Sequence, residues 1–345
     1  MNSFFEIIKR SYKYLIVLNI ILLAFIIYQL FFSKYHWNGN DEKRFIIEPG
    51  KSSDQIISEL EKNDIIPSSL IFKIVLKLTG KEAQIISNHY LFKNGMNNLQ
   101  LLEQLTNKEL NQKVKLVIPE GYTIKQIGKL IEKKLSLSKE KFYNESTNDS
   151  LINLLGINGK VKTLEGFLYP DTYDVSPSIS EKAIVLILFN EFRKKISRSD
   201  LPELKDSMLL ATITLASIIQ GETRLEKEMP VVAGVYVNRM KKGMRLEADP
   251  TIQYIIADGP RRLLYEDLKI NSPYNTYINK GLPPGPINNP GISAIRAALE
   301  PDEHNFIFFV ATGQGGHKFT ENYEQHLNAV KEYRRIMKND SSQKK

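Results

Sequence analysis

The sequence predicts an α+β protein that begins with a transmembrane helix, and three observations lead to this fold class. An uncharged apolar run near the N-terminus is long enough to cross a bilayer as a helix. A strand–turn–helix pattern then occurs twice, and an almost wholly apolar helix later in the chain precedes a short strand–turn–strand segment. We therefore expect an anchor, small α/β units, and a mixed α+β domain with a central buried helix and a small antiparallel sheet.

The composition of the 345 residues excludes several kinds of chemistry. There are no cysteines, which removes disulfides, thiol catalysis and cysteine metal sites, and the five histidines have no recognisable ligand spacing. We therefore expect no metal and no cofactor. The formal charge of +8 is spread along the chain, and no nucleic-acid-binding motif occurs. An anionic lipid surface or cell-wall polymer is thus a better candidate partner than a nucleic acid.

Residues 14–32 form the predicted transmembrane anchor, because they carry no charge over a length of about 19 residues. A cleavable signal peptide is the alternative, but the run is longer than a usual hydrophobic region and no A-x-A cleavage site follows it. Residues 1–13 include Lys9, Arg10 and Lys13 and are expected to stay in the cytoplasm. This predicts a single-pass plasma-membrane protein whose larger part lies outside the cytoplasm.

The repeated strand–turn–helix pattern occupies residues 46–60 and 117–131. In each copy a glycine turn precedes a serine or threonine that can cap the following amphipathic helix. The aligned pairs are Gly50 with Gly121, Ser52 with Thr123, Gln55 with Gln126 and Ile56 with Ile127. The pattern resembles the LysM-like units of cell-wall proteins, so we assign residues 43–135 to a LysM-like region. Two generic strand–turn–helix units are the alternative.

The other elements follow from periodicity and from glycine and proline positions. The expected helices are residues 68–106 with breaks near Gly80 and Asn94–Gly95, helices within 136–158, and 181–195, 207–222, 229–242, 293–299 and 322–337. The expected strands are residues 306–311 and 317–319, and residues 339–345 are an expected disordered tail. Residues 164–175 combine aromatic and acidic side chains that suit sugars, with a packed loop as the alternative. Residues 271–291 form a long Gly/Pro/Asn loop that we expect to line a cleft.

Glu222 lies near the end of the central apolar helix. It falls on one helical face with Leu215, Ile218 and Ile219. An apolar environment desolvates a carboxylate and raises its pKa. A carboxylic acid that stays protonated near neutral pH can serve as a general acid. The alternative is a surface residue at a frayed helix end.

Six ordered strings between Leu164 and Phe319 carry a family resemblance: LEGFLYPDTY, LASIIQGET, VAGVYVNRM, GMRLEADPTIQY, SPYNTYINKGLPPGPINNPG and FFVATGQGGHKF. They resemble the catalytic domain of the YceG-like endolytic murein transglycosylases, the MltG family, and we assign residues 136–338 to such a domain. The family cuts peptidoglycan glycan strands internally and leaves a 1,6-anhydro-MurNAc end. Its catalytic acid is a glutamate on the central helix.

One departure from the family pattern concerns this glutamate. Many members have two glutamates in the string ASI-x-E-x-E-T, whereas this chain has Gln220 at the first position and Glu222 at the second. The two positions differ by about 200° around a helix axis, so we expect them to face opposite ways. Glu222 shares the apolar stripe, and we place the acid there.

The resemblance implies a peptidoglycan lytic transglycosylase, a carbon–oxygen lyase that cuts the MurNAc-β-1,4-GlcNAc bond with Glu222 as general acid and then base. The predicted substrate-binding residues, each with a structural role as the alternative, are Glu165, Asn238, Asp249, Gln253, Tyr274, Asn275 and His317. Peptidoglycan strands are the expected substrate, and cell-wall synthases or division and elongation proteins are candidate partners. The rival functions are a two-carboxylate muramidase hydrolase and a non-catalytic, membrane-anchored wall-binding scaffold.

Overall fold

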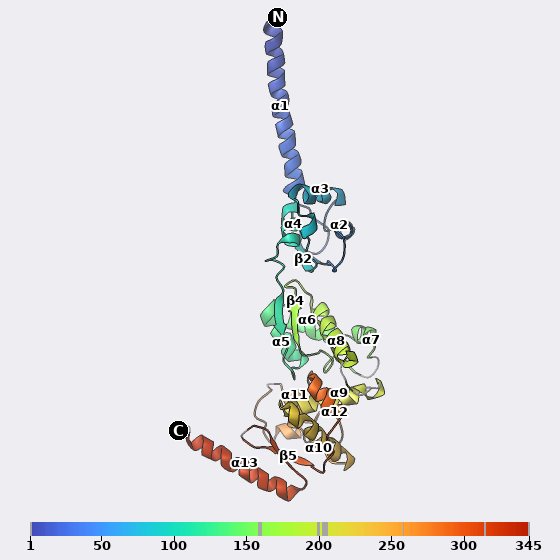
Figure 1. Cartoon of the computed structure of the whole chain (residues 1–345), viewed down its shortest axis with the longest axis vertical. Coiled ribbons are helices and arrows are strands. Elements are labelled where there is room, and N and C mark those ends of the chain that lie inside the picture. Colours follow the sequence, from blue (N-terminus) through green and yellow to red (C-terminus); the bar gives the residue numbers. More distant parts are fainter. Residues whose placement is uncertain are drawn as a thin grey trace. The chain divides into compact units, whose positions relative to one another are not determined.

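The computed structural model of the protein describes residues 2–157, 161–198, 201, 206–257, 259–313 and 315–343. The chain divides into two units, each with its own buried residues (Figure 1). Unit 1 consists of Met1–Val114 and Asp174–Ile179, and unit 2 of Lys115–Tyr173 and Ser180–Lys345. The described elements form a mixed α+β structure with three two-stranded sheets. The predicted α+β class is therefore confirmed, while the domain boundaries predicted from the sequence stay predictions.

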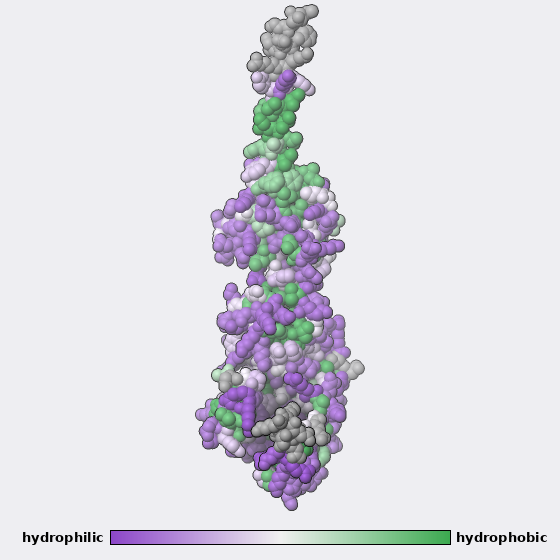
Figure 2. All heavy atoms as spheres, turned by 90° about the vertical axis from the view of Figure 1, so that its left-hand side faces the viewer, coloured by the Kyte–Doolittle hydropathy of each residue, from purple (hydrophilic) through white to green (hydrophobic). Residues whose placement is uncertain are grey.

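Unit 1 contains one long apolar helix and a small α+β body. Its elements are α1 (Asn2–Phe31), β1 (Glu42–Ile46), α2 (Ser53–Lys62), α3 (Ser69–Thr79), the 3₁₀ helix η1 (Glu82–Gln84), β2 (His89–Lys93) and α4 (Asn98–Thr106). Within α1, Tyr12–Phe31 is the one stretch of the described residues that is long and apolar enough to cross a membrane. Figure 2 shows hydrophobic residues along this part of the helix. The predicted apolar helix is confirmed.

Both copies of the repeated pattern form a strand, a glycine turn and a capped helix. β1 ends at the first residue of the first copy, and β3 (Val114–Val117) ends at the first residue of the second. Gly50 and Gly121 both have positive φ angles, of 89° and 77°, which glycine adopts without steric cost. The helices that follow, α2 and α5 (Ile124–Leu135), each begin with a complete capping box. The LysM-like assignment itself stays a prediction.

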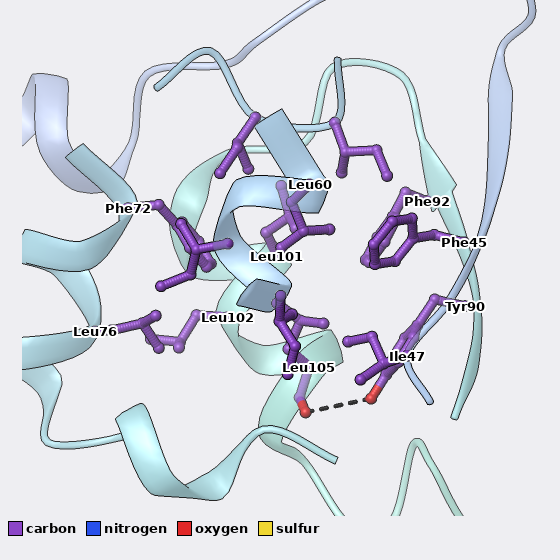
Figure 3. Packing of buried hydrophobic residues seen from close by; sticks show 14 of the residues in the cluster. Phe45, Ile47, Leu60, Phe72, Leu76, Tyr90, Phe92, Leu101, Leu102 and Leu105 are labelled. Carbon is purple, nitrogen blue, oxygen red and sulfur yellow. Dashed lines mark hydrogen bonds between the residues drawn. The ribbon is translucent and has the colours of Figure 1, made fainter. Parts of the chain in front are cut away.

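The core of unit 1 packs between its small sheet and its helices (Figure 3). β1 pairs with β2 in antiparallel register, with Phe45 opposite Tyr90. The prediction of helix throughout residues 68–106 was wrong at β2. Tyr90 and Phe92 are buried in the core and alternate with half-buried neighbours, which is the period of two of a strand. The pairing with β1 stabilises this segment as a strand rather than a helix. The predicted breaks at Gly80 and at Asn94–Gly95 are confirmed.

Unit 2 surrounds the predicted central helix. After β3 and α5 its elements are α6 (Lys139–Ser146), α7 (Asp149–Leu154), β4 (Thr172–Val175), α8 (Glu181–Arg198), α9 (Asp206–Glu222), η2 (Glu226–Glu228), α10 (Met229–Lys241), α11 (Asp249–Ile255), η3 (Asp267–Lys269), α12 (Ile292–Leu299), β5 (Phe308–Ala311), β6 (His317–Thr320) and α13 (Tyr323–Gln343). β3 pairs with β4, and β5 pairs with β6. The helices predicted from periodicity in this half are confirmed.

α9 is the predicted central buried helix. Every residue from 212 to 220 is buried, and α9 contacts α10, α11 and α12. A helix that is apolar on nearly all sides needs such a shell of partners, because any uncovered side would expose apolar surface to water. The shell leaves the helix C-terminus uncovered at Gly221 and half-buried at Glu222.

The last elements form the predicted hairpin and terminal helix. β5 and β6 pair in antiparallel register, with Val310 opposite Lys318, so the small antiparallel sheet is confirmed. β5 begins at Phe308, two residues later than predicted. α13 continues to Gln343, past the predicted end at residue 337, and the last two residues of the predicted tail lie outside the described residues.

We predict that Phe72→Ala destabilises unit 1 by about 3–5 kcal/mol, the usual cost of removing a large aromatic side chain from a packed core. Phe72 is fully buried on the inner side of α3. Trp37 is the only tryptophan of the chain and is buried in the same core, so its fluorescence during denaturant unfolding reports this unit. The matched control is Leu78→Ala on the exposed side of α3, for which we expect a change within about 0.5 kcal/mol. Equal effects would contradict the assignment of the two sides.

Candidate active site

A cavity of about 480 Å³ surrounds the C-terminal end of α9. Its lining comes from five parts of unit 2, namely residues within 120–126 at the start of α5, residues 220–224 at the end of α9, α11, Pro260, and the loop residues Ile287 and Asn288. The second strand–turn–helix copy therefore forms one wall of this cavity. Glu222, Asp249 and Gln253 are the sequence-predicted site residues that the structure brings together here.

A second cavity, of about 290 Å³, lies on the other side of two of these carboxylates. Glu222 and Asp249 line it as well, together with Tyr236, Arg239 and Tyr277. The side chains of β5 and of α13 complete its wall. The two carboxylates therefore stand between two adjoining hollows.

The Glu222 carboxyl group is held by one strong hydrogen bond. The Tyr236 hydroxyl, on α10, donates to Glu222 Oε1 at 2.5 Å. The other oxygen, Oε2, accepts no hydrogen bond from the described residues, which leaves it available to a ligand. The pKa of Glu222 is raised to about 7, chiefly because burial disfavours the charged form. The Tyr236 hydrogen bond and the Arg239 charge lower it, and the negative charge of Asp249 raises it.

Tyrosines hold the two carboxylates that line both cavities, Glu222 and Asp249. The Tyr277 hydroxyl, from the long loop, donates to Asp249 Oδ1 at 2.5 Å. The pKa of Tyr236 lies well above its ordinary value, because burial and the Glu222 charge both disfavour a phenolate. Tyr236 thus remains a neutral donor at any physiological pH. These hydrogen bonds fix the positions of the two acids relative to α10 and the loop.

Gln220 lines the same cavity as Glu222, although we expected the two positions to face opposite ways around the helix. The cavity wraps around the end of α9, and both sides of the last turn therefore reach it. Gln220 Oε1 accepts a hydrogen bond from the Gly291 backbone at 3.0 Å. Its side chain also contacts Glu120, whose pKa is raised by burial and by the charge of Glu226, against a lowering hydrogen bond from Gln220.

Two glycines permit the close approach of backbone around the cavity. A Cβ atom at Gly221 would lie 2.6 Å from Pro250 of α11, and one at Gly291 would lie 1.8 Å from Glu120 Oε1. No side chain fits at either distance without movement of its neighbour. These positions explain the glycines in the strings LASIIQGET and NNPG by packing rather than by chemistry.

Glu165 and Gln253, both predicted to bind substrate, make hydrogen bonds to the backbone. Glu165 is buried, and its Oε1 accepts from the backbone of Ile124 at 3.0 Å, at the start of α5, and from Asn289 Nδ2 at 3.0 Å. Burial raises its pKa to about 8, against these hydrogen bonds and the charge of Lys125. Gln253 lines the 480 Å³ cavity but bonds through both amide atoms to the backbone of Arg261.

Glu165 and the other four predicted residues line neither of these two cavities. Asn238 donates to the backbone oxygens of His304 and Phe306. Asn275 is fully buried and donates to the backbone oxygens of Leu268 and Ile270, just before the long loop. The ring of Tyr274 packs on Tyr254 with centroids 5.1 Å apart. His317 Nδ1 lies 2.9 Å from Glu228 Oε2. Their substrate contacts stay predictions.

The sequence reasoning missed Tyr236, Tyr277, Glu120 and Asn288. Tyr236 and Tyr277 stand inside the strings VAGVYVNRM and SPYNTYINK, and neither string indicates a carboxylate partner, because the partners lie 14 and 28 residues away in sequence. Asn288 donates to the Ser217 backbone at 2.7 Å, while its Oδ1 is buried without a hydrogen-bond partner at the cavity wall. Such an orphan acceptor beside a cavity is a candidate ligand contact.

The described residues contain no group of three or more histidine or acidic side chains that could hold a metal ion.

Comparison with known proteins places this geometry in a family. A model of the YceG-like family matches residues 45–332. The chain belongs to the YceG-like family. A solved structure of a YceG-like protein from Listeria monocytogenes superposes with a TM-score of 0.57 at 30% sequence identity, over 84% of this chain and 99% of that one.

Two relatives of this YceG-like chain have names that describe an activity. An endolytic murein transglycosylase of Bacillus subtilis is 32% identical over 302 residues, which cover 83% of each chain. An endolytic murein transglycosylase of Streptococcus pneumoniae is 26% identical over 317 residues. That match covers 83% of this chain but only 57% of the streptococcal protein, which is therefore substantially longer.

We predict that Tyr236→Phe raises the pKa of Glu222 above about 7, because the lost hydrogen bond stabilises the carboxylate. The pKa can be measured by carbon-13 NMR of glutamate-labelled protein, with the Glu222→Gln variant identifying the resonance. The matched control is Tyr274→Phe, which removes a hydroxyl outside both cavities and should leave this resonance unchanged. A lowered pKa in Tyr236→Phe would contradict the assigned role of the hydrogen bond.

Proposed function

We propose that this YceG-like protein is an endolytic peptidoglycan lytic transglycosylase that cleaves the MurNAc-β-1,4-GlcNAc bond with Glu222 as its general acid and then its base. The observation that carries the proposal is a carboxylic acid with a pKa near 7 whose Oε2 is available to a ligand in a cavity. The names of the Bacillus and Streptococcus relatives support the substrate and the reaction class.

In the first step Glu222 acts as an acid. Tyr236 donates to Oε1, which favours a proton on Oε2 in the neutral form. From Oε2 the proton passes to the glycosidic oxygen between MurNAc and GlcNAc, and the bond to C1 of MurNAc breaks. Positive charge develops on the MurNAc ring, while Glu222 becomes a carboxylate that the Tyr236 hydroxyl stabilises.

In the second step the Glu222 carboxylate acts as a base. It takes the proton of the C6 hydroxyl of the same MurNAc, and that oxygen closes on C1 to give the 1,6-anhydro ring. An intramolecular nucleophile is strongly favoured by proximity, so neither water nor a second carboxylate is required. The acid is regenerated in its starting protonation state, which allows one residue to complete the cycle.

The cavity offers groups of the kind that bind amino sugars. Asn288 Oδ1, which has no partner, is an acceptor for the N–H of an N-acetyl group. Tyr122 and Tyr254 provide aromatic surface in the same wall, against which the C–H faces of sugar rings can pack. Arg224 adds a cation for the lactyl or peptide carboxylates that distinguish peptidoglycan from neutral glycans.

An apolar helix that spans the membrane would hold the enzyme near its substrate. We propose that α1 crosses the plasma membrane once, with the N-terminus in the cytoplasm and the rest of the chain on the side where peptidoglycan lies. The uncharged length of Tyr12–Phe31 and the preceding basic residues support this topology.

Asp249 favours one alternative, a two-carboxylate hydrolase. It shares both cavities with Glu222, and paired carboxylates are the usual equipment for hydrolysis of glycosides. A hydrolase would activate water with Asp249 and would release reducing ends rather than anhydro ends. The Tyr277 hydrogen bond gives Asp249 a structural role that does not require this chemistry.

We predict that Glu222→Gln abolishes cleavage of purified glycan strands and leaves the fold and strand binding intact. The amide keeps the shape and accepts the Tyr236 hydrogen bond but has no proton to give to the leaving oxygen. General acid–base help is worth about 10² to 10⁴ in rate, and one residue provides both steps here, so the loss should reach the upper end. Mass analysis of the digest for anhydro ends measures the activity.

Asp249→Asn is the matched comparison for this variant. A lytic transglycosylase should keep forming anhydro ends in Asp249→Asn, although more slowly, because the change lowers the pKa of Glu222 by removing a neighbouring charge. Loss of cleavage in Asp249→Asn, with reducing ends as the wild-type product, would favour the hydrolase. No cleavage by the wild-type protein in spite of strand binding would favour a wall-binding scaffold.

The rate should fall as the pH rises through about 7. Glu222 must begin protonated, its pKa lies near 7, and above this pH the carboxylate form predominates. A profile of the rate of anhydro-end release against pH measures the midpoint, and Tyr236→Phe should move that midpoint to higher pH. A flat profile between pH 5 and 9 would rule out Glu222 as the rate-determining acid.

A further inference from the structure

α3 exposes an unusual amount of apolar surface on one side. Leu70 and Leu78 are 68% and 66% exposed, and Ile71 and Ile74 are 36% and 40% exposed. At 100° per residue these four side chains fall within about one quarter of the helix circumference. We call them the α3 stripe. The opposite side, with Phe72, packs in the core of unit 1. Packing in this core explains the apolar residues on that side but not the exposed apolar residues of the stripe.

Within unit 1, α3 lies beside the end of the apolar helix α1 (Figure 1). α3 and α4 both contact α1, and Figure 1 shows α3 next to the end of α1. The junction is packed rather than loose, because Leu30 and Phe31 pack against the core of unit 1. The Leu30 backbone oxygen also accepts a hydrogen bond from Asn98 Nδ2 of α4 at 2.8 Å. Unit 1 therefore holds α3 at the level where α1 ends.

Basic side chains border the stripe. Lys73 and Lys77 lie on α3 at about 60° and 20° from Leu70, on the side away from Ile71. Lys34 follows the end of α1 and is exposed. Lys73 is paired with Asp54 at 2.6 Å, whereas Lys77 remains exposed. An apolar stripe with lysines along its border is the pattern of a helix that lies in a membrane interface.

We propose that α3 is an interfacial helix, whose stripe enters the outer leaflet of the bilayer that α1 crosses while Lys77 contacts lipid phosphates. The inference rests on the proposed membrane insertion of α1. The contact of α3 with the apolar helix that is proposed to cross the bilayer identifies the bilayer as the occupant of the stripe. The two contacts together fix the orientation of unit 1 on the membrane surface, which a single helix would leave free to rotate.

The absence of cysteine makes a site-specific test direct. Ile74→Cys in the full chain is labelled with the fluorophore NBD and reconstituted in vesicles of phosphatidylcholine and phosphatidylglycerol. We expect a blue-shifted emission, quenching by lipids with a doxyl group near the headgroup, and several-fold less quenching by aqueous iodide than at a control site. The control is Lys108→Cys, which follows the last turn of α4, about 13 Å along that helix from the turn that contacts α1.

Two further variants test separately whether α1 inserts in the bilayer and whether the α3 stripe drives the insertion of α3. Leu22→Cys places the label within α1, where lipid quenching confirms insertion of the anchor. Quenching at position 22 without quenching at 74 would overturn the role of α3 alone, whereas its absence at both would overturn the anchor as well. The Leu70→Glu and Leu78→Glu changes together, with the label kept at position 74, should restore iodide access if the stripe drives insertion.

Protection of position 74 from both iodide and lipid quenchers, increasing with protein density, would mean that another copy of the protein covers the stripe. That result would also overturn the proposal. The fluorescence of Trp37, buried in the core of unit 1, verifies that each labelled variant is folded. Because none of these measurements involves glycan cleavage, their outcome does not depend on the proposed catalytic function.

Discussion

The burial of α9 is the constraint on which the structure of unit 2 depends. A helix with nine consecutive buried residues, 212 to 220, is stable only inside a shell of other elements, and α10, α11 and α12 supply it. The same shell desolvates the carboxyl group at the end of the helix. The raised pKa of Glu222 is therefore a direct consequence of the packing that makes α9 the centre of the fold.

A hydrogen-bond network extends this constraint to the walls of the cavity. Asn289 is fully buried, and its Oδ1 accepts from the backbones of Gly166 and Leu168, each at 2.9 Å. Its Nδ2 donates to the Tyr122 backbone and to Glu165. One amide thus ties the long loop to the aromatic segment and to the turn before α5. Glu165 and Asn289 thus hold the walls of the cavity together but do not line the cavity beside Glu222.

Tyr236 and Tyr277 stabilise the charged forms of two carboxyl groups, Glu222 and Asp249, by hydrogen bonds. A carboxyl group with a pKa near 7 has to exist in both charge states during the proposed reaction, and burial penalises the charged one. The Tyr236 hydroxyl supplies a hydrogen bond to Glu222 at 2.5 Å and cannot itself ionise in this environment. Tyr277 provides the same kind of bond to Asp249, so the two carboxylates that line both cavities are each paired with a tyrosine hydroxyl.

The sequence by itself determined the apolar helix at the N-terminus, the two capped strand–turn–helix copies, the buried central helix and the final hairpin. Each depends on local signals, such as an uncharged run, a Ser/Thr cap with glutamine three residues on, or a period of 3.6, that act within a few residues. The apolar stripe ending at Glu222 also predicted the direction of its pKa shift.

Only the tertiary structure decided which polar residues face the cavity and which hold backbone together. β2 became a strand because it pairs with β1, 43 residues or more away in sequence, and Gln220 reached the cavity because the hollow curves around the helix end. Asn275 and Asn238 have the same chemistry as a sugar-binding amide, but their donors are taken by backbone oxygens. The partners of Asn238 lie 66 and 68 residues away in sequence, and a one-dimensional pattern contains no information about that proximity.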